Sequence, residues 1–303
     1  EDILYFILVN VLFVSYSIFR LQAIRKKQSA GKNLLKFGGI TLAVFFIGYL
    51  TTLPFIKLYY DSTYRKSNTL RPSSQAIMDK LTGGFKITTY VNMLDGNSFI
   101  GLPSSYKTDV GSFEKYIRFK PEIEMEYVYY YHQTDNPILD RQFPKLNAEQ
   151  RLDTLRKFNK WNFEILPYEA IKKRVDLSSE NYRFVRVLER DNGRKTFLRV
   201  YDDMQRVPME SEISAAIKRL VMDELPVVGF VSGHGERNSN STQDRGYKTI
   251  TQEKAFRYSM INQGFDFKEL DLSKPVPENI NILIIAEPRQ AYNEQELSNL
   301  HAY

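Results

Sequence analysis

The sequence contains no cysteine among its 303 residues. Disulfides, thiolate metal sites and cysteine nucleophiles are therefore excluded, although this absence alone does not identify the redox compartment. Histidine is almost as scarce, because only His132, His234 and His301 occur and their spacing matches no metal-binding motif such as HExxH. We therefore expect neither a bound metal nor a cofactor.

Signatures of common enzymes are also missing. The sequence has no GxxxxGK[ST] phosphate-binding loop and no GxSxG nucleophile elbow, and Gly233-His234-Gly235 lacks the third glycine of a dinucleotide fingerprint. Adjacent carboxylates at Asp202-Asp203 and Asp223-Glu224 are more typical of solvated turns than of catalysts. The sequence therefore predicts no catalytic residues and no ATP hydrolysis by a phosphate-binding loop.

Acidic residues are absent between residues 20 and 37, where Lys and Arg are concentrated. The six basic residues of this stretch equal the formal net charge of +6, so the other residues sum to zero. The basic excess is local, which argues against nucleic acid as a partner. Apolar runs at residues 3–19 and 37–60 flank the stretch, and the second is long enough to cross a hydrocarbon core of about 30 Å. Residues 1–60 are thus predicted to form two transmembrane helices joined by a basic cytoplasmic loop at 20–37.

This orientation places every residue after 60 outside the cytoplasm. In a bacterium with two membranes, the protein would sit in the inner membrane with its soluble domains in the periplasm. The alternative is that the apolar runs are buried core helices of a soluble protein. The chain opens without Met at an apolar run and stops within a predicted helix, so we expect an internal fragment of a longer protein.

The remaining residues predict α/β architecture in two domains after a polar linker at 61–69. In the first domain, residues 70–205, apolar periodicity and turn residues predict helices at 73–81, 110–119 and from 147, strands at 85–92 and 123–131, and a hairpin around Asp191-Asn192-Gly193. In the second, residues 206–303, they predict helices from 208, at 254–263 and at 293–303, and strands at 226–233, 265–270 and 280–286. The apolar strands at 226–233 and 280–286 are typical of a buried parallel sheet, so the second domain is predicted to be doubly wound and incomplete.

A glycine-rich turn, Ser232-Gly233-His234-Gly235-Glu236, directly follows the first of these buried strands. Ligands of open α/β sheets bind outside the carboxyl ends of strands. His234, Glu236 and Arg237 are therefore our candidates for ligand or partner binding, and the plainer alternative is a turn with a structural role only. The polar loop that follows, 237–249, is expected to be exposed and mobile, with a lid or a docking loop as the alternative.

A tyrosine-rich stretch, Tyr127–Tyr131, lies within the predicted strand at 123–131. Tyrosine is common at binding surfaces, so this strand is a candidate for binding a cell-wall sugar or a lipid. A strand that simply packs one face against the core is the plainer interpretation. A deep apolar groove lined by Tyr127 or Tyr129 would favour the first.

A series of motifs follows in order in the second half of the chain. Gly233-His234-Gly235-Glu236 comes after a buried strand, then a strand runs from Pro277 to Ile285, then Pro288 precedes an acidic helix start at Glu294 and Glu296. In this order the chain resembles the GldG-type auxiliary family of ABC transporters, which is named from gliding motility. The resemblance covers about residues 60–303 and rests on the order of the motifs.

The resemblance implies a periplasmic, membrane-tethered domain beside an ABC-2-type permease and a cytoplasmic ATPase. It also implies that the second domain has a class I glutamine-amidotransferase-like fold without the catalytic cysteine, and this chain has no cysteine. The additional helix before the anchor departs from single-anchor members of the family. It favours fusion to a permease whose last helix would be residues 3–19.

The sequence thus predicts a membrane-anchored, extracytoplasmic auxiliary or permease-linked subunit of an ABC transporter, of the gliding-motility type and not an enzyme. Its predicted partners are the ATPase subunit, the permease and the lipid bilayer, and a homo-oligomer stays open. The alternatives are a periplasmic enzyme that uses His234 and Glu236 in acid–base chemistry and a module that binds cell-wall glycan. The sequence does not identify the transported substrate or the direction of transport.

Overall fold

The computed structural model describes residues 2–26, 30–53 and 60–303. The chain divides into two compact units, residues 1–66 and residues 67–303. We describe each unit by itself.

The first unit contains two helices, α1 (Asp2–Lys26) and α2 (Ala30–Thr52). They pack as an antiparallel pair, with the rings of Tyr16 and Phe37 5.5 Å apart. The predicted basic loop at 20–37 is wrong for most of its length, because α1 continues to Lys26 and α2 begins at Ala30. Arg, Lys, Leu and Ala are strong helix formers, so the charged stretch extends both helices. Residues 27–29 lie outside the described part of the chain.

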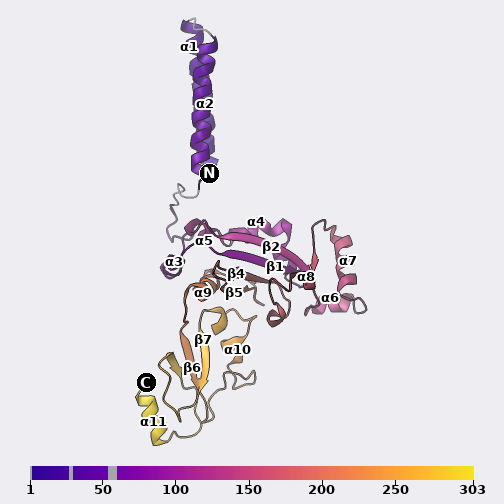
Figure 1. Cartoon of the computed structure of the whole chain (residues 1–303), viewed down its shortest axis with the longest axis vertical. Coiled ribbons are helices and arrows are strands. Elements are labelled where there is room, and N and C mark those ends of the chain that lie inside the picture. The colour runs from indigo at the N-terminus through magenta and orange to yellow at the C-terminus, as the bar shows by residue number, and fades with distance from the viewer. Residues whose placement is uncertain (1, 27–29, 54–59) are drawn as a thin grey trace. The chain divides into compact units, whose positions relative to one another are not determined.

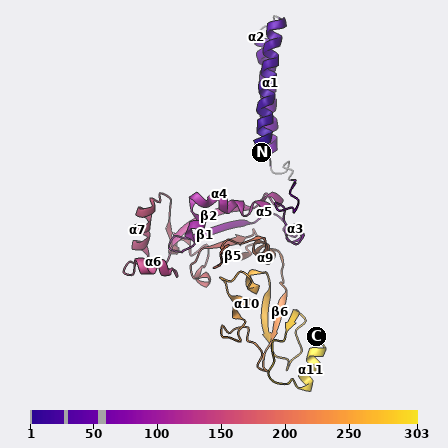
Figure 2. The ribbon, with the colours of Figure 1, turned by 180° about the vertical axis from the view of Figure 1, so that it is seen from behind.

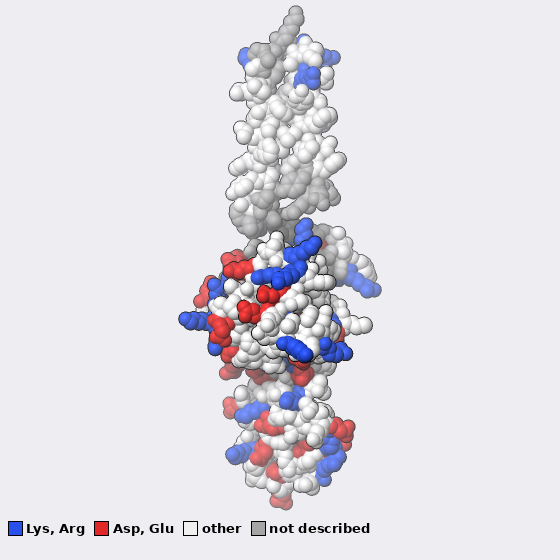
Figure 3. Space-filling view, turned by 90° about the vertical axis from the view of Figure 1, so that its right-hand side faces the viewer, with Lys and Arg blue, Asp and Glu red and all other residues white. Residues whose placement is uncertain are grey.

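Large apolar side chains cover the outside of this helix pair. Phe6, Phe13 and Phe45 each expose about seven tenths of their surface (71%, 69% and 69%). Among the described residues, one helix segment, Phe6–Arg25, is long and apolar enough to cross a membrane, and α2 contains a shorter apolar stretch, Leu34–Leu50. Figure 3 shows Lys and Arg gathered at one end of the pair. An N-terminal apolar helix is confirmed, and the second span stays a prediction because residues 54–59 are outside the described part.

The second unit is built on two sheets, as expected for an α/β protein (Figure 1). The larger sheet has the strand order β3-β2-β1-β4-β5. Pairing is parallel between β1 and β2 and between β2 and β3, and antiparallel between β1 and β4 and between β4 and β5, so the sheet is mixed. The strands are β1 (Lys86–Asn92), β2 (Glu124–Tyr131), β3 (Leu166–Pro167), β4 (Val185–Glu189) and β5 (Lys195–Arg199).

The β4–β5 hairpin confirms the sequence prediction. Its turn needs a residue with positive φ, and Gly193 supplies φ +81° without the steric cost of a Cβ atom. The predicted strands at 85–92 and 123–131 are also confirmed, as β1 and β2. These predictions rested on the alternation of apolar and polar residues along a strand and on turn-forming residues such as glycine. Both signals depend only on residues that are close in sequence.

Short helices connect these strands, and Figure 1 and Figure 2 place α6 and α7 at one end of the sheet and α3 at the other. The capping box of α7 is formed as predicted, with Asn147 Oδ1 accepting the Gln150 N–H at 2.9 Å and Gln150 Oε1 accepting the Asn147 N–H at 3.1 Å. The single helix predicted at 110–119 is instead two helices, α4 and α5, because Phe113 turns into the core between them. The helices are α3 (Pro72–Asp79), α4 (Tyr106–Gly111), α5 (Glu114–Phe119), α6 (Pro137–Gln142), α7 (Ala148–Asn159) and α8 (Tyr168–Ile171), with 3-10 turns at Ser98–Gly101, Pro103–Ser105 and Ser178–Glu180.

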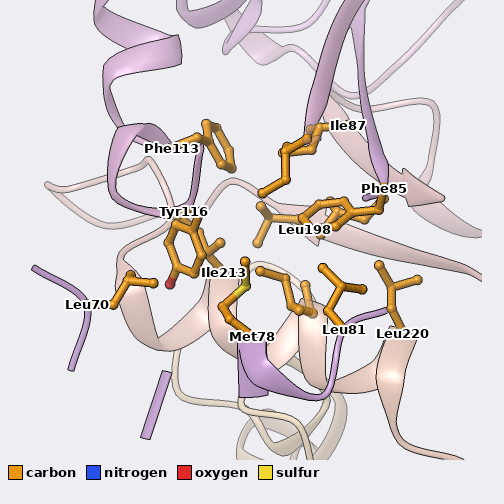
Figure 4. Packing of buried hydrophobic residues seen from close by; sticks show 14 residues of the cluster. Leu70, Met78, Leu81, Phe85, Ile87, Phe113, Tyr116, Leu198, Ile213 and Leu220 are labelled. Atoms are coloured by element: carbon orange, nitrogen blue, oxygen red, sulfur yellow. The ribbon is translucent and has the colours of Figure 1, made fainter. Parts of the chain in front are cut away.

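The helix predicted from residue 208 is α9 (Glu210–Val221), and it completes the core of the larger sheet. Ile213, Ile217 and Leu220 are at most 2% exposed and belong to one buried cluster with Leu198 of β5. Figure 4 shows these side chains meeting those of α3 and of the α4–α5 segment. Although α9 opens the predicted second domain, its apolar face is buried against the first.

The smaller sheet is entirely parallel, with the strand order β7-β6-β8. The three predicted strands are confirmed as β6 (Val227–Val231), β7 (Asp266–Leu270) and β8 (Ile280–Ile284). Two helices accompany them, α10 (Lys248–Gln252) and α11 (Glu294–His301) (Figure 2). The strand predicted at 280–286 was expected to be buried, and this is wrong for part of β8. Because β8 lies at the sheet edge with one neighbour, Ile282 is 48% exposed.

The helix predicted at 254–263 is wrong. This segment consists of turns and a short 3-10 helix, Met260–Asn262. The side-chain amide of Asn262 donates to the carbonyls of Lys254 (3.0 Å) and Phe256 (3.0 Å), which competes with helical hydrogen bonding.

Arg257, in the same segment, points inward and forms an ion pair with Glu212. The two side chains of this pair are 2% and 0% exposed. Arg257 also donates to Asp203 (Nε to Oδ2, 2.8 Å). We call Arg257, Glu212 and Asp203 the junction cluster, because they connect this segment to α9 and to the chain after β5.

Candidate functional site

The glycine-rich turn lies where the order of the parallel strands reverses. From β6 the chain passes to β7 on one side and then to β8 on the other, so the β6–β8 boundary is the switch point of the sheet. The turn after β6 meets the segment after β8 there. The N–H groups of Arg289 and Gln290 donate to the His234 carbonyl at 2.7 and 3.1 Å, and the Arg237 N–H donates to the Ala286 carbonyl at 2.9 Å. The turn therefore occupies the position at which open α/β sheets bind ligands.

Two glycines allow this close approach. Gly233 has φ +122° and Gly235 has φ +75°, conformations that residues with a Cβ atom rarely adopt. A Cβ atom at Gly235 would also lie 3.2 Å from the Cβ of Arg289. The glycines thus set the backbone shape and allow the two segments to pack together.

His234 connects the turn to α11. Its Nε2 lies 3.2 Å from Oε2 of Glu296, and its ring centroid lies 4.4 Å from that of Tyr292. Nδ1 is buried without a hydrogen-bond partner and lies 3.9 Å from Oε1 of Glu236. The side chain is 16% exposed, so one edge of the ring faces solvent at the surface of the turn.

Glu236 is fixed inside the turn, with its side chain 1% exposed. Oε2 accepts the His234 N–H at 2.7 Å, and Oε1 accepts the hydroxyl of Tyr292. Burial alone would raise the pKa of Glu236, but these hydrogen bonds outweigh it, so the pKa lies below its usual value. Burial and the bond to Glu236 raise the pKa of Tyr292. Glu236 is therefore an ionised carboxylate held by neutral donors.

Arg237 lies beside the turn and faces the segment after β8. Its Nε is 2.9 Å from Oε2 of Glu287, which also accepts Nη1 of Arg245 at 2.8 Å. Arg245 in addition donates to the Gly235 carbonyl at 2.8 Å. Glu287 has φ +58°, a conformation uncommon for a residue other than glycine. The structure thus brings His234 and Glu236 together and places Arg237 in a second ion cluster next to them.

The loop at 237–249 is tied down rather than free. Asn238 and Gly246 form an isolated β-bridge, and the Asn238 N–H donates to the Arg245 carbonyl at 3.1 Å. Ser239 is fully buried and its hydroxyl donates to Glu269 of β7 at 2.8 Å. These contacts follow from polar side chains that find partners on the neighbouring strand ends. Most of the loop is exposed, as expected, and its mobility stays a prediction.

Sequence reasoning missed four residues of this site, Tyr292, Glu296, Glu287 and Arg245. The first three follow β8, far in sequence from the turn, and Arg245 lies in the loop at 237–249. The signal that identifies the first three is topological, because the chain after β8 must return to the switch point once the strand order is β7-β6-β8. Among the described residues, no group of three or more His, Asp or Glu side chains is arranged to hold a metal ion.

The tyrosine-rich strand is β2, and its tyrosine side chains pack on both faces of the sheet. Tyr130 is fully buried, the hydroxyl of Tyr127 donates to Asp109 at 2.5 Å, and the ring of Tyr129 lies 4.5 Å from that of Phe163. Neither of two clefts in the second unit, one near β5 and one near Glu180, is lined by Tyr127 or Tyr129. The packing contacts favour the plainer interpretation of this strand.

Comparison with known proteins gives one match. Residues 225–303, about a quarter of the chain, match the model of a family described as an ABC-type uncharacterized transport system. The matched segment contains β6, the turn, the tied loop, β7, β8 and α11. No curated protein and no solved structure matches the chain. The family match supports a role as an auxiliary component of an ABC-type transport system.

Proposed function

We propose that this protein is a non-enzymatic, membrane-anchored auxiliary subunit of an ABC transporter that acts through contacts with other proteins. The observation that carries the proposal is the family match over residues 225–303, because those residues build the turn at the switch point. The ATPase subunit, the permease and the lipid bilayer are the proposed partners. The order of motifs around the turn further supports the gliding-motility type, and the additional helix before the anchor supports a permease fused ahead of it.

The membrane helices in this proposal are α1, which would be the last helix of the fused permease, and α2, which would be the anchor. Their apolar surfaces are exposed, and Arg20, Arg25 and Lys32 lie near the end where α1 passes to α2. Basic residues close to membrane helices favour the cytoplasmic side. The linker at 61–69 and the α/β regions at 70–205 and 206–303 would then lie in the periplasm of a bacterium with two membranes.

The second α/β region is proposed to share the class I glutamine-amidotransferase-like fold. The parallel order β7-β6-β8 supports this, since doubly wound sheets contain a reversal of strand order of this kind. The position that follows β6 carries a glycine turn without cysteine, serine or threonine within Gly233–Glu236. In this proposal the fold serves as a binding platform.

The geometry of the turn favours contact with a protein over catalysis. The Glu236 side chain is 1% exposed and both of its oxygens accept hydrogen bonds inside the protein, so a substrate has little access to this carboxylate. His234 and Arg237 reach the surface, with side chains 16% and 31% exposed. We assign partner contact to these two residues, and to Glu236 the role of holding the turn.

The proposal is tested by purifying the full-length protein from its native membrane in mild detergent. We expect the ATPase and permease subunits to co-purify, and their absence under several detergents would contradict the proposal. The variant Arg237→Ala should reduce their recovery, whereas Lys145→Ala, an exposed lysine on the larger-sheet side of the unit, serves as the control.

One observation favours the alternative of a periplasmic enzyme: the buried Nδ1 of His234 has no partner in the protein. The variant His234→Gln separates the two functions. An enzyme would lose activity in the cell while the transporter complex stays intact. A contact residue would instead lose the complex and the function together.

A further inference from the structure

The two faces of α1 differ in what they contact. One face packs against α2, where a Cβ atom built on Gly48 would lie 3.8 Å from Cδ1 of Leu8. The less exposed residues of α1 that share this face are Leu8, Leu12, Ser15, Phe19 and Ala23. At 3.6 residues per turn, the opposite side of the helix carries Ile7, Asn10, Val14, Ser17, Leu21 and Ile24. We call these six residues the outer face of α1, and its apolar members are between 51% and 71% exposed.

Asn10 places a polar amide on this otherwise apolar surface. One of its N–H groups donates to the Phe6 carbonyl of its own helix at 2.7 Å. In the described part of the chain, its second N–H and its Oδ1 have no hydrogen-bond partner. The nearest charged residues of α1, Asp2 and Arg20, are about 12 and 15 Å away along the helix axis. If α1 crosses a bilayer, this amide lies in hydrocarbon, where an unpaired polar group is costly and a second helix can supply its partner.

The outer face has the spacing of a helix–helix contact. Its six residues are separated alternately by three and four positions, as in coiled coils and in most pairs of membrane helices. None of the six is charged. The other polar member, Ser17, donates its hydroxyl to the Phe13 carbonyl of its own helix at 2.9 Å. The face is therefore an apolar seam with one group, the Asn10 amide, that needs a partner.

A second copy of the chain supplies that partner. Every copy inserts into the membrane in the same orientation, so two copies present their outer faces in parallel with Asn10 at the same depth. An asparagine amide is both a donor and an acceptor, so the unpaired N–H of one copy can donate to the unpaired Oδ1 of the other. A two-fold axis uses the same surface on both partners and brings these two amides together. Lipid tails offer neither a donor nor an acceptor.

We propose that the outer face of α1 forms a parallel, two-fold contact with a second copy of this chain, in which the two Asn10 amides hydrogen-bond to each other. A single asparagine on an apolar seam also fixes the register of the two helices. The inference rests on the membrane anchoring of the proposed function and adds to it a contact surface and a dimer. The contact brings two α/β units into one assembly, so the turn at the switch point is present twice.

The surface is tested with the 303-residue chain reconstituted in lipid vesicles. Since this chain contains no cysteine, Val14→Cys introduces a single thiol on the outer face. Val9→Cys is the matched control, because Val9 is equally exposed (63% against 52%) but lies between the two faces of the helix. A disulfide needs Cα atoms within about 7 Å, so mild oxidation should link Val14→Cys into dimers about fivefold more than Val9→Cys. Equal linkage of the two variants, or no linkage of either, would overturn the proposal.

The amide is tested by diluting labelled chains with lipid and measuring energy transfer between them. Asn10→Leu should weaken association about threefold to tenfold, which is the usual range for one hydrogen bond between membrane helices. Asn10→Gln keeps an amide and should lose less. Ser15→Ala is the control and should leave association unchanged, because its hydroxyl donates to the Leu12 carbonyl on the side that faces α2. Unchanged association of Asn10→Leu would overturn the proposal.

Two further measurements separate this inference from the proposed function. Release of the chain from the vesicles by alkaline carbonate would contradict membrane anchoring and overturn both, whereas a retained but monomeric chain would overturn this inference alone. In the native membrane, a benzophenone attached to Val14→Cys of the full-length protein should label a second copy. Labelling of a permease helix in its place would assign the outer face to the permease and overturn the dimer.

Discussion

The junction cluster and the glycine turn both bury a glutamate, but they stabilise it in different ways. Glu212 is fully buried and pairs with Arg257, a permanently charged guanidinium that also holds Asp203. Glu236 is buried almost as completely, and its partners are a tyrosine hydroxyl and a backbone N–H, with His234 beside it. The first arrangement joins segments 45 residues apart, and its one exposed member, Asp203, is bound to Arg257. The second leaves His234 and Arg237 at the surface, as a contact site requires.

The same substitution, glutamate to glutamine, distinguishes the two regions most strongly. Glu212→Gln removes the charge opposite Arg257 and should lower the free energy of unfolding by about 3–5 kcal/mol, because breaking a buried ion pair leaves an uncompensated charge. Glu236→Gln removes a carboxylate held by neutral donors and should cost about 1.5–3 kcal/mol. Urea unfolding of both variants in one detergent checks the comparison. Equal losses in the free energy of unfolding would show that Asp203 alone compensates the charge of Arg257.

Glycine at position 235 gives the next largest expected effect. Gly235→Ala places a Cβ atom at φ +75° and 3.2 Å from Arg289, so it should destabilise the protein by about 1–3 kcal/mol. Gly111→Ala is the matched control, since its Cβ would meet no atom within 4 Å and it ends a helix at ordinary φ. That control should be neutral or stabilise by about 0.5–1 kcal/mol. Thermal unfolding of the two variants measures the difference, and a neutral Gly235→Ala would refute the tight turn.

The sequence located the turn but not the residues that complete it. Gly233, His234 and Glu236 are adjacent in sequence and follow a recognisable strand, so local patterns were sufficient. Tyr292 and Glu296 lie about 60 residues further on, and only the strand order brings them to His234. A tertiary contact, the burial of Arg257, also explains why the predicted helix at 254–263 does not form. Local chemistry thus predicted the strands and the turn, and long-range pairing determined the rest.

The response to pH sharpens the comparison further. The pKa of Glu236 is lowered in the folded protein, so its contribution to stability is present above the unfolded value of about 4.3 and is lost as pH falls toward the folded pKa. We expect the melting temperature to fall between pH 6 and pH 3 less steeply in Glu236→Gln than in the unaltered protein. The other carboxylates are present in both proteins, so their titration does not contribute to the difference between the two curves. They include Asp203, whose pKa is lowered by its hydrogen bond to Arg257. Parallel curves would contradict a lowered pKa at Glu236.

Arg237 gives the smallest expected change in stability and therefore the sharpest test of function. Its ion pair with Glu287 is partly exposed on both sides, and Arg245 bonds the same carboxylate oxygen, so Arg237→Ala should cost about 0–1 kcal/mol. If the turn were structural only, so small a loss would leave the transporter complex intact. A contact site instead predicts that recovery of the ATPase and permease falls while the melting temperature stays within a few degrees. Arg245→Ala is the matched control, because it removes the other half of the cluster. Equal loss of partners in both variants would assign the contact to Glu287 or to the tied loop as a whole, and unchanged recovery in both would move it away from the turn.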